Sequence, residues 1–219
     1  MYVVVNAAQS VDGKLSTRRR EQLAISGAED FDRVDRIRAA ADAVLVGVGT
    51  VLADDPHLTL DEEARRVERL RNGRAGNPAR VVVDSTGRTP LDARILDDAA
   101  TTYLLVSDAA ATERCEALAA AGATVIVAGD DRVDLADGVA RLADHGVDRL
   151  MIEGGGEVIF SILAAGIVAE LQVHSASVAV GGREAPTPAN RDGLAEPLPP
   201  LPTPAPDPPP DRPAPSPLA

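Results

Sequence analysis

Short runs of β-branched residues alternate along this chain with stretches rich in alanine, arginine and glutamate, and this alternation strongly constrains the fold. It is typical of parallel α/β construction. The runs predict strands at Tyr2–Ala8, Ala43–Gly47, Arg80–Asp84, Thr102–Val106, Thr124–Val127, Arg149–Ile152 and about Glu170–Ala176. The intervening stretches predict helices at about Ala28–Ala41, Ala111–Ala121, Leu135–His145 and Glu157–Ala165, with Gly122 and Gly146 as C-terminal caps.

The core of such a sheet has to be aliphatic. Hydrophobic residues make up 45% of the 219 residues and aromatic residues only 2%. Parallel strands that are buried on both faces use valine, isoleucine and leucine. The charged segment Glu62–Asn77 predicts a short exposed helix or a loop, and not a domain boundary.

Charge and cysteine content exclude several classes of partner. A formal net charge of −12 repels nucleic acid and anionic membrane surfaces, so neither is expected to bind. The acidic excess, with arginine in place of lysine, predicts a halophilic protein. The single cysteine, Cys115, excludes an internal disulfide and a Cys-based zinc site, and no apolar run reaches the roughly 18 residues of a membrane span. We expect a cytoplasmic protein that is neither exported nor membrane-spanning.

One lysine stands out in the segment "SVDGKLS". Lys14 is the only lysine among 22 basic residues, and it follows the turn Asp12-Gly13. It can be an exposed turn residue without a role. Retention of a compact ammonium in a chain that otherwise uses arginine instead favours a function that a planar guanidinium cannot fill.

A first glycine-containing segment is "VLVGVGTVLADDPHLT". A buried strand is expected to end at Gly47, and Gly49, Thr50 and Asp54 follow on a turn or helix. The glycines permit close approach of the backbone to a ligand. Taken alone, the Gly-x-Gly pair favours a plain strand-to-helix turn over a ligand cradle, and Leu52 occupies the place of the third glycine of the dinucleotide fingerprint.

A second such segment is "LMIEGGGEVIF", in which a strand leads through Glu153 into three glycines that open a helix. Exposed N–H groups at a helix N-terminus, with its positive dipole end, are a natural seat for pyrophosphate. Glu153 would point into the crevice at the carboxyl ends of the strands. The alternative is a flexible turn, although three glycines cost more conformational entropy than a simple turn requires.

Two further segments carry candidate polar residues. In "FDRVDRIRAAAD" most arginines are expected on a solvated helix face, and one of Arg33, Arg36 and Arg38 is a candidate phosphate clamp. In "VVVDSTGRTPL" the polar residues after the strand suit a ribose or its phosphate, or they form an ordinary turn. The histidines show no metal-ligand spacing, and no metal is expected.

The motifs "NAAQSVDGKLS", "ISGAEDFDRVDRIRAAADAVLVGVGTVLADDPHLT", "NPARVVVDSTGRTPL", "LMIEGGGEVIFSIL" and "GGREAPT" together resemble the riboflavin-pathway pyrimidine reductases of archaeal and fungal type. They are also similar to the reductase half of the bacterial bifunctional deaminase/reductase. The resemblance covers about Tyr2 to Thr187. It implies a dihydrofolate-reductase-like α/β fold with a mostly parallel sheet flanked by helices, a homodimer, and NADPH, with NADH possible, as the hydride donor.

The resemblance also implies an activity and a set of site residues. The family reduces the ribosyl group of 2,5-diamino-6-ribosylamino-4(3H)-pyrimidinone 5′-phosphate to ribityl. Cofactor contacts are expected at Thr50, Asp54, Val83, Asp84, Ser85, Gly154, Gly155 and Gly156. Substrate contacts are expected at Ser26, Arg38, Leu58 and Glu153, with Arg38 as the phosphate clamp. We hypothesise that Lys14 and Glu153 are catalytic and bracket the ribose.

The C-terminus departs from the family. Of the 17 prolines, 14 fall between Pro186 and Pro217, where relatives form a hydrophobic hairpin that completes the sheet. We therefore expect a reductase domain over residues 1–187, missing or altered C-terminal strands, and a disordered tail over residues 188–219. A frameshift near Ala189–Leu194 would produce such a tail. Another pterin or pyrimidine reductase, or a catalytically impaired remnant, stays open as an alternative.

Overall fold

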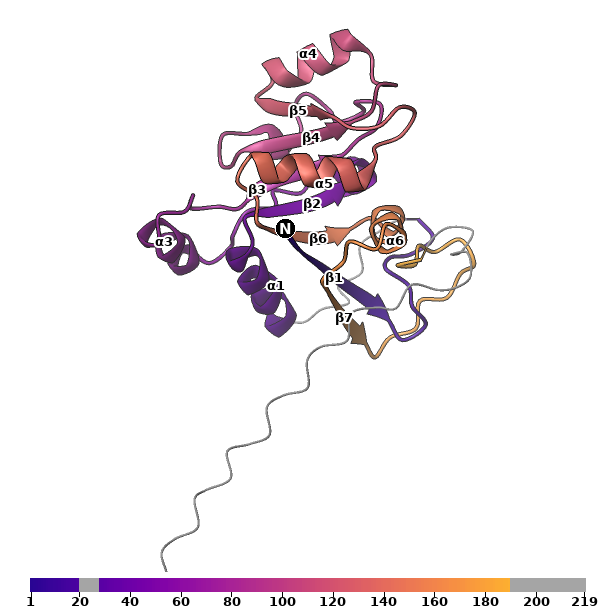
Figure 1. Ribbon diagram of the computed structural model, residues 1–219. Helices are drawn as coiled ribbons and strands as arrows, with labels where there is room; N and C mark the ends of the chain where they lie inside the picture. Colours follow the sequence, from indigo (N-terminus) through magenta and orange to yellow (C-terminus); the bar gives the residue numbers. More distant parts are fainter. Residues whose placement is uncertain (20–27, 190–219) are drawn as a thin grey trace, which may run out of the picture.

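A parallel sheet forms the centre of the molecule. The computed structural model describes residues 1–19 and 28–189. Within this part of the chain the strand order is β5-β4-β3-β2-β6-β1-β7, and every strand pair is parallel (Figure 1). The strands are β1 Tyr2–Ser10, β2 Ala43–Gly47, β3 Ala79–Val83, β4 Thr102–Val106, β5 Ala123–Val127, β6 Arg149–Gly154 and β7 Glu170–Ala176.

Helices connect these strands. They are α1 Ala28–Ala40, α2 Val48–Asp54, α3 Glu63–Arg71, α4 Thr112–Ala120, α5 Leu135–Asp144 and α6 Gly156–Ala164, with a short 3-10 turn at Arg94–Leu96. The segment expected to be either a helix or a loop forms α3. Gly122 and Gly146 follow α4 and α5 with φ angles of 105° and 80°, as expected of glycines that end helices.

Apolar side chains cover both faces of the sheet. On one face α5 and α6 pack on alternate strand residues, for example Ile162 on Ile152 and Val5. On the other face α2 and α4 pack on residues such as Val44 and Val82. Full burial of β2 on both faces explains its continuous run of small and branched aliphatic residues. The α/β class with a mostly parallel sheet is confirmed.

The strand β7 forms one edge of the sheet. It pairs with β1 alone among the described residues, and its residues are half-buried or exposed. The residues from 190 onward, which include most of the proline-rich tail, lie outside the described part. The boundary expected at residues 187 and 188, and the altered C-terminal strands, stay predictions.

Candidate active site

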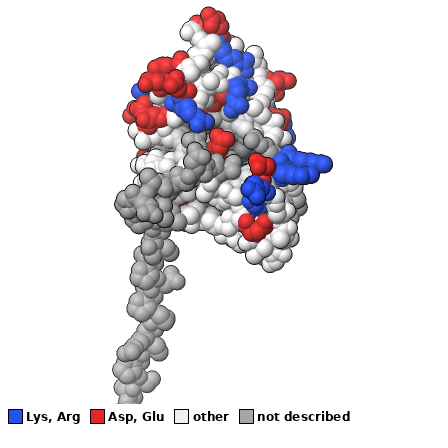
Figure 2. All heavy atoms as spheres, turned by 90° about the vertical axis from the view of Figure 1, so that its right-hand side faces the viewer, with Lys and Arg blue, Asp and Glu red and all other residues white. Residues whose placement is uncertain are grey.

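The strand order reverses between β2 and β6, which lie side by side. After β2 the chain continues to β3 on one side, and after β6 it continues to β7 on the other. The two helices that leave this point, α2 and α6, pack on opposite faces of the sheet. Open α/β sheets bind ligands at the carboxyl ends of the strands at such a switch point. The strand arrows end on the right in Figure 1, and Figure 2 views the molecule from that side.

The two glycine segments face each other across this point. A Cβ added to Gly155 would lie 3.7 Å from Thr50 Oγ1 and 4.0 Å from the backbone nitrogen of Gly47. A Cβ on Gly154 would lie 3.9 Å from the same hydroxyl. The structure thus brings together three residues expected to contact a cofactor, Thr50, Gly154 and Gly155, although their segments are about a hundred residues apart in the chain.

The start of α6 suits an anionic group. Gly155 precedes the helix with a φ of 68° and no side chain caps the helix. The first N–H groups of a helix lack intrahelical acceptors and carry its positive dipole end. Around Gly154 and Gly155 only the hydroxyl of Thr50 and the nitrogen of Gly47 lie within 4 Å of where a Cβ would be, so a ligand can approach this backbone closely. The residues present therefore fit the pyrophosphate of a dinucleotide.

Asp84 follows β3, the strand next to β2, and its side chain is fully buried. One carboxylate oxygen, Oδ2, accepts hydrogen bonds from Thr89, at 2.7 Å from the backbone nitrogen and 2.8 Å from the hydroxyl. The other, Oδ1, has no hydrogen-bond partner among the described residues, and Arg88 Nε lies 4.0 Å from it. Asp84 therefore holds the turn that carries the exposed Arg88.

Ser85 links this turn to its neighbours. Its hydroxyl accepts a hydrogen bond from the backbone nitrogen of Val133 at 3.1 Å, and its carbonyl accepts from the Ser107 hydroxyl at 2.9 Å. Arg114 of α4 donates to the carbonyls of Gly87 and Thr89. The turn after Val83 is thereby held firmly at the carboxyl edge of the sheet. These bonds leave the expected cofactor contacts of Val83, Asp84 and Ser85 as predictions.

Arg38 and Glu153 form a bidentate ion pair. Arg38 Nε donates to Oε1 at 2.5 Å and Nη2 donates to Oε2 at 2.6 Å, while Nη1 donates to the carbonyl of Thr59 at 3.1 Å. Both side chains are largely buried. Burial alone lowers the pKa of Arg38, but Glu153, with Asp61 and Asp35, raises it above its ordinary value. Two residues expected to contact substrate are therefore held by each other.

A β-bulge places Glu153. Leu45 of β2 pairs with Ile152 of β6, whereas the next residue, Val46, pairs with Gly154, so Glu153 is the additional residue. Bulges aim side chains differently from the regular alternation and are frequent beside active sites. As a result Glu153 meets Arg38 of α1, and Gly154 immediately after it meets Thr50 of α2.

The loop after α2 has unusual backbone angles. Asp55 and Leu58 have φ angles of 40° and 55°, a region that residues other than glycine seldom occupy. Leu58 is buried, and the adjacent Thr59 accepts from Arg38. Strain of this kind persists where the surrounding structure fixes it, often near functional sites. This loop places Leu58, an expected substrate contact, next to the ion pair. Asp54, an expected cofactor contact, is the last residue of α2.

Lys14 lies in a loop fastened after β1. Its backbone N–H donates to Ser10 Oγ at 2.9 Å. Asp12 accepts from Ser10 Oγ at 2.7 Å and from the backbone of Val180 and Gly181, which lowers its pKa to about 2. The ammonium makes one hydrogen bond among the described residues, 3.4 Å to the carbonyl of Ala185. Neither a hydrogen bond nor an ion pair joins Lys14 and Glu153 within the described residues, so their joint role stays a prediction.

Comparison with known families shows to which family this chain belongs. A sequence model of the RibD C-terminal domain matches residues 1–201 of this chain. The chain belongs to the RibD C-terminal domain family. Ser26, whose expected substrate contact also came from the resemblance, lies outside the described residues.

Curated relatives of this RibD-type domain carry informative names. A protein of Archaeoglobus fulgidus named 2,5-diamino-6-ribosylamino-4(3H)-pyrimidinone 5′-phosphate reductase is 47% identical over 186 residues, 85% of this chain and 84% of that protein. A protein of the same name from Methanothermobacter thermautotrophicus is 45% identical over 195 residues, 89% of this chain and 86% of that protein. The chain is thus a reductase of the RibD type, as expected.

A solved structure agrees on the fold. A pyrimidine reductase-like protein from Corynebacterium diphtheriae superposes with a TM-score of 0.76 at 21% identity, covering 84% of this chain and 78% of that one. At this identity the likeness concerns the fold alone. It supports the expected α/β architecture of the RibD C-terminal domain.

One polar residue in β1 was missed by sequence reasoning. Asn6 is 5% exposed, and its Oδ1 has no hydrogen-bond partner within the described residues. Read as a sequence, "VVVNAAQS" is a plain strand. The only available signal was a carboxamide in the middle of a run of buried aliphatic residues.

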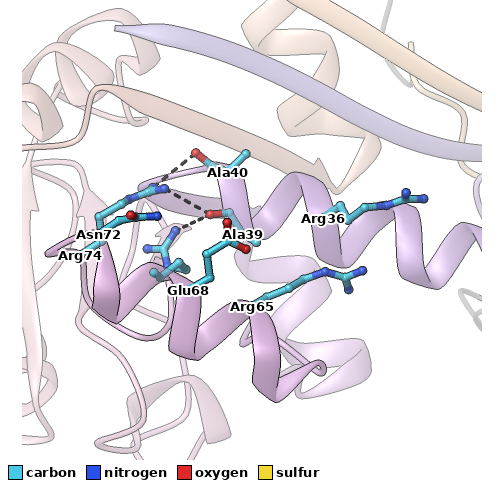
Figure 3. Close-up of a pocket in the computed structure, with 8 residues that line it drawn as sticks. Arg36, Ala39, Ala40, Arg65, Glu68, Asn72 and Arg74 are labelled. Carbon is cyan, nitrogen blue, oxygen red and sulfur yellow. Dashed lines mark hydrogen bonds between the residues drawn. The ribbon is translucent and has the colours of Figure 1, made fainter.

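A groove elsewhere on the domain has another explanation. It has a volume of about 320 Å³ and is lined by α1 and α3 (Figure 3). Arg69 and Arg74 donate there to the carbonyl of Ala39 near the end of α1 and to that of Ala41 just after it. Burial and the charge of Arg74 lower the pKa of Arg69 to about 10. The two arginine side chains in this groove cap the C-terminal end of α1, which lies at the amino end of the sheet and away from the switch point.

Proposed function

We propose that this protein reduces the ribosyl group of 2,5-diamino-6-ribosylamino-4(3H)-pyrimidinone 5′-phosphate to a ribityl group with NADPH. The observation that carries the proposal is the succession Glu153-Gly154 at the switch point. Glu153 is bonded to Arg38 on one side, and Gly154 faces Thr50 on the other. The names of the archaeal relatives, at 45–47% identity over most of the chain, support the same substrate.

The nicotinamide cofactor, when bound, supplies a hydride for the first carbon of the sugar. Thr50 and the glycines Gly154, Gly155 and Gly156 are proposed to hold its pyrophosphate. Asp54, and Val83, Asp84 and Ser85 at the end of β3, are proposed to line the rest of its path. Parallel strands end at the same edge, so a dinucleotide lying on β2 would extend over the neighbouring β3.

Arg88 favours NADPH over NADH. Dinucleotide sites that prefer NADH place a free carboxylate on the ribose 2′-hydroxyl, whereas an arginine accommodates the 2′-phosphate of NADPH. Here the carboxylate of Asp84 is buried and bonded to Thr89. Arg88 on the same turn is 60% exposed, and its nearest carboxylate oxygen is 4.0 Å away. A phosphate beside this turn would meet an available guanidinium.

Arg38 and Glu153 are proposed to bind the substrate together with Leu58 and Ser26. A guanidinium has five N–H donors. Glu153 accepts from the N–H of Nε and from one N–H of Nη2, and the carbonyl of Thr59 accepts from one N–H of Nη1. Nη1 and Nη2 therefore each keep one N–H for a ligand. This remaining pair can hold a phosphate oxygen. Glu153 keeps the guanidinium in place and acts as an acceptor toward the sugar.

Lys14 is proposed to supply charge beside the reacting carbon. Its ammonium has three donors, and its one hydrogen bond in the described part of the chain is long, at 3.4 Å. The loop around it is held by Asp12, so the ammonium is positioned without an ion pair to a carboxylate among the described residues. Opening of the ribosyl ring to its C=N form leaves negative charge on the departing ring oxygen, and an ammonium beside that oxygen stabilises this charge before the hydride adds to the first carbon.

The test follows NADPH absorbance with the ribosylamino substrate and, separately, with dihydrofolate. We expect oxidation of NADPH with the ribosylamino substrate alone, and a ribityl product by mass spectrometry. Turnover of dihydrofolate instead would assign the site to another pterin reductase. A chain that binds NADPH but turns over neither compound would be a catalytically impaired remnant.

The setting of the enzyme is also proposed. The chain is expected to be a homodimer, because β7 is an unpaired edge within the described residues and apolar side chains such as Phe31 (60% exposed) and Val173 (45%) stand on the surface. The charge of −12 with one lysine supports a halophilic protein. Helices able to cross a membrane are absent among the described residues. The cytoplasmic location stays a prediction from sequence.

A further inference from the structure

Asn6 carries a buried acceptor that the fold leaves empty. Its side chain lies in β1 and only 5% of the residue is exposed. Oδ1 finds no donor among the described residues. Buried polar atoms in folded proteins almost always have a partner, and an exception calls for an explanation such as a ligand.

The side-chain acceptors next to Asn6 on the neighbouring strands do have donors. β1 lies between β6 and β7, and Asn6 is paired with Gln172 of β7. The acceptors on both neighbouring strands are occupied by arginines of α1: Gln172 Oε1 accepts from Arg33 at 3.0 Å, and Glu153 accepts from Arg38. The middle strand alone offers an acceptor without a donor among these three positions.

The sheet face also leads from Asn6 toward the crevice. Val3, Val5 and Ala7 pack into the core on the side of α5 and α6, so Asn6 belongs to the opposite face. The next residue on that face, Ala8, is only half-buried. Along β1, burial thus decreases from Asn6 through Ala8 toward the carboxyl edge of the sheet, where Glu153 lies near the end of β6 and Lys14 follows β1.

Ligand chemistry narrows the partner. An orphan acceptor needs a donor, which a phosphate dianion lacks. In the proposed substrate the ribosyl group at position 6 must reach the cofactor at the crevice, so the opposite edge of the pyrimidine would enter deepest. That edge carries two donors, the N3–H and the 2-amino group, and a 2-oxo analogue keeps only the first.

We propose, building on the function proposed above, that Asn6 Oδ1 accepts a hydrogen bond from the 2-amino group and selects 2-aminopyrimidines against 2-oxo analogues. A 2-oxo group would place a second acceptor against Oδ1. Sites built to bond a substrate N–H reject analogues that lack it much more strongly than apolar pockets reject an extra group. Asn6 is thus a specificity-determining residue for the heterocycle.

The test compares two substrates that differ only at position 2, the diaminopyrimidinone and its 2-oxo analogue. For the unaltered enzyme we expect kcat/KM to favour the 2-amino compound at least tenfold. In Asn6→Leu this preference should fall to within about threefold, through a higher KM for the 2-amino compound. Equal losses for both compounds, or an unchanged preference, would overturn the assignment.

Gln9→Leu is the matched control, because it removes a carboxamide from the same strand on the opposite face. It should leave the preference unchanged. Thermal unfolding separates binding from folding: Asn6→Leu removes an unpaired polar atom, so its Tm should be equal or higher. A lower Tm with an unchanged preference would mean that Asn6 is structural. Activity of the unaltered enzyme reports on the proposed function independently.

Discussion

Arginine and lysine serve different purposes at the scale of single residues. Arg80 is fully buried in β3 and donates to the carbonyls of Asp97 and Ala100. Arg38 and Arg69 likewise hold backbone carbonyls. Their planar, multiple donors suit this bracing role. Lys14 braces only weakly through its side chain, which is consistent with retention for a ligand.

Replacing Lys14 tests this difference. Lys14→Met keeps the length of the side chain and removes the charge, so turnover with saturating substrate should fall at least tenfold. Lys14→Arg should restore little, because a guanidinium cannot reproduce a compact ammonium. Steady-state kinetics give the answer, and near-normal turnover of the Met variant would rule out the role.

Arg88 offers a second residue-scale prediction. Arg88→Ala should lower the preference for NADPH over NADH about tenfold, since a charge-assisted contact to the 2′-phosphate is lost. Binding of 2′,5′-ADP by calorimetry should weaken by a similar factor, whereas 5′-AMP should bind as before. Arg141→Ala, on the exposed surface of α5 with Asp137 as its partner, is the control and should change neither.

At the scale of elements, the approach of β2 to α6 depends on one missing side chain. A Cβ on Gly47 would lie 2.8 Å from Val158 Cγ2, closer than such atoms normally come. Gly47→Ala should therefore destabilise the protein by about 1–3 kcal/mol, the usual cost of overpacking. Gly49→Ala, in α2 and with nothing within 4 Å, should be neutral or stabilising. Urea unfolding compares the two, and equal effects would contradict the packing argument.

The loop that carries Lys14 should respond to acid. The pKa of Asp12 falls from an ordinary 3.8 to about 2 because Ser10, Val180 and Gly181 donate to the carboxylate. As the pH falls, the Asp12 carboxylate therefore takes up its proton at a lower pH in the folded state than in the unfolded state. This stability is complete above pH 4 and is lost as the pH falls toward 2. Urea midpoints should fall less over this interval in Asp12→Ala; an identical slope would exclude the contribution.

Much of this architecture was predictable from local sequence. The runs at β2, β4 and β7 gave the observed bounds because β-branched residues and turn signals lie close together there. The prediction ended β6 at Ile152 because the bulge at Glu153 has no sequence signature. For α2 the sequence predicts either a turn or a helix, because this helix has only 7 residues and includes Gly49.

The site was less predictable than the fold. Spacing could not select Arg38 among its neighbours, since its partner Glu153 is 115 residues away and only the resemblance placed both at the substrate. The orphan state of Asn6 depends on what three strands and a helix do with their donors, which a linear pattern does not contain.

At the scale of the whole molecule, the charge of −12 should make stability depend on salt. Screening shortens the range of repulsion from about 10 Å at 0.1 M to about 3 Å at 1 M. Raising KCl over this range should therefore raise Tm, as differential scanning fluorimetry can record. A Tm that falls with salt would show that attractive pairs dominate instead.

The bulge at Glu153 has a consequence for how the two ligands are spaced. In the proposed site Glu153 belongs to the substrate side and Gly154 to the cofactor side, so one peptide unit of about 3.8 Å would join the two halves of the reaction. Their separation is set by covalent bonds and not by the closure of two domains. Such a reductase needs no hinge to bring its reactants within reach, and substitutions that loosen its outer helices should leave that distance untouched.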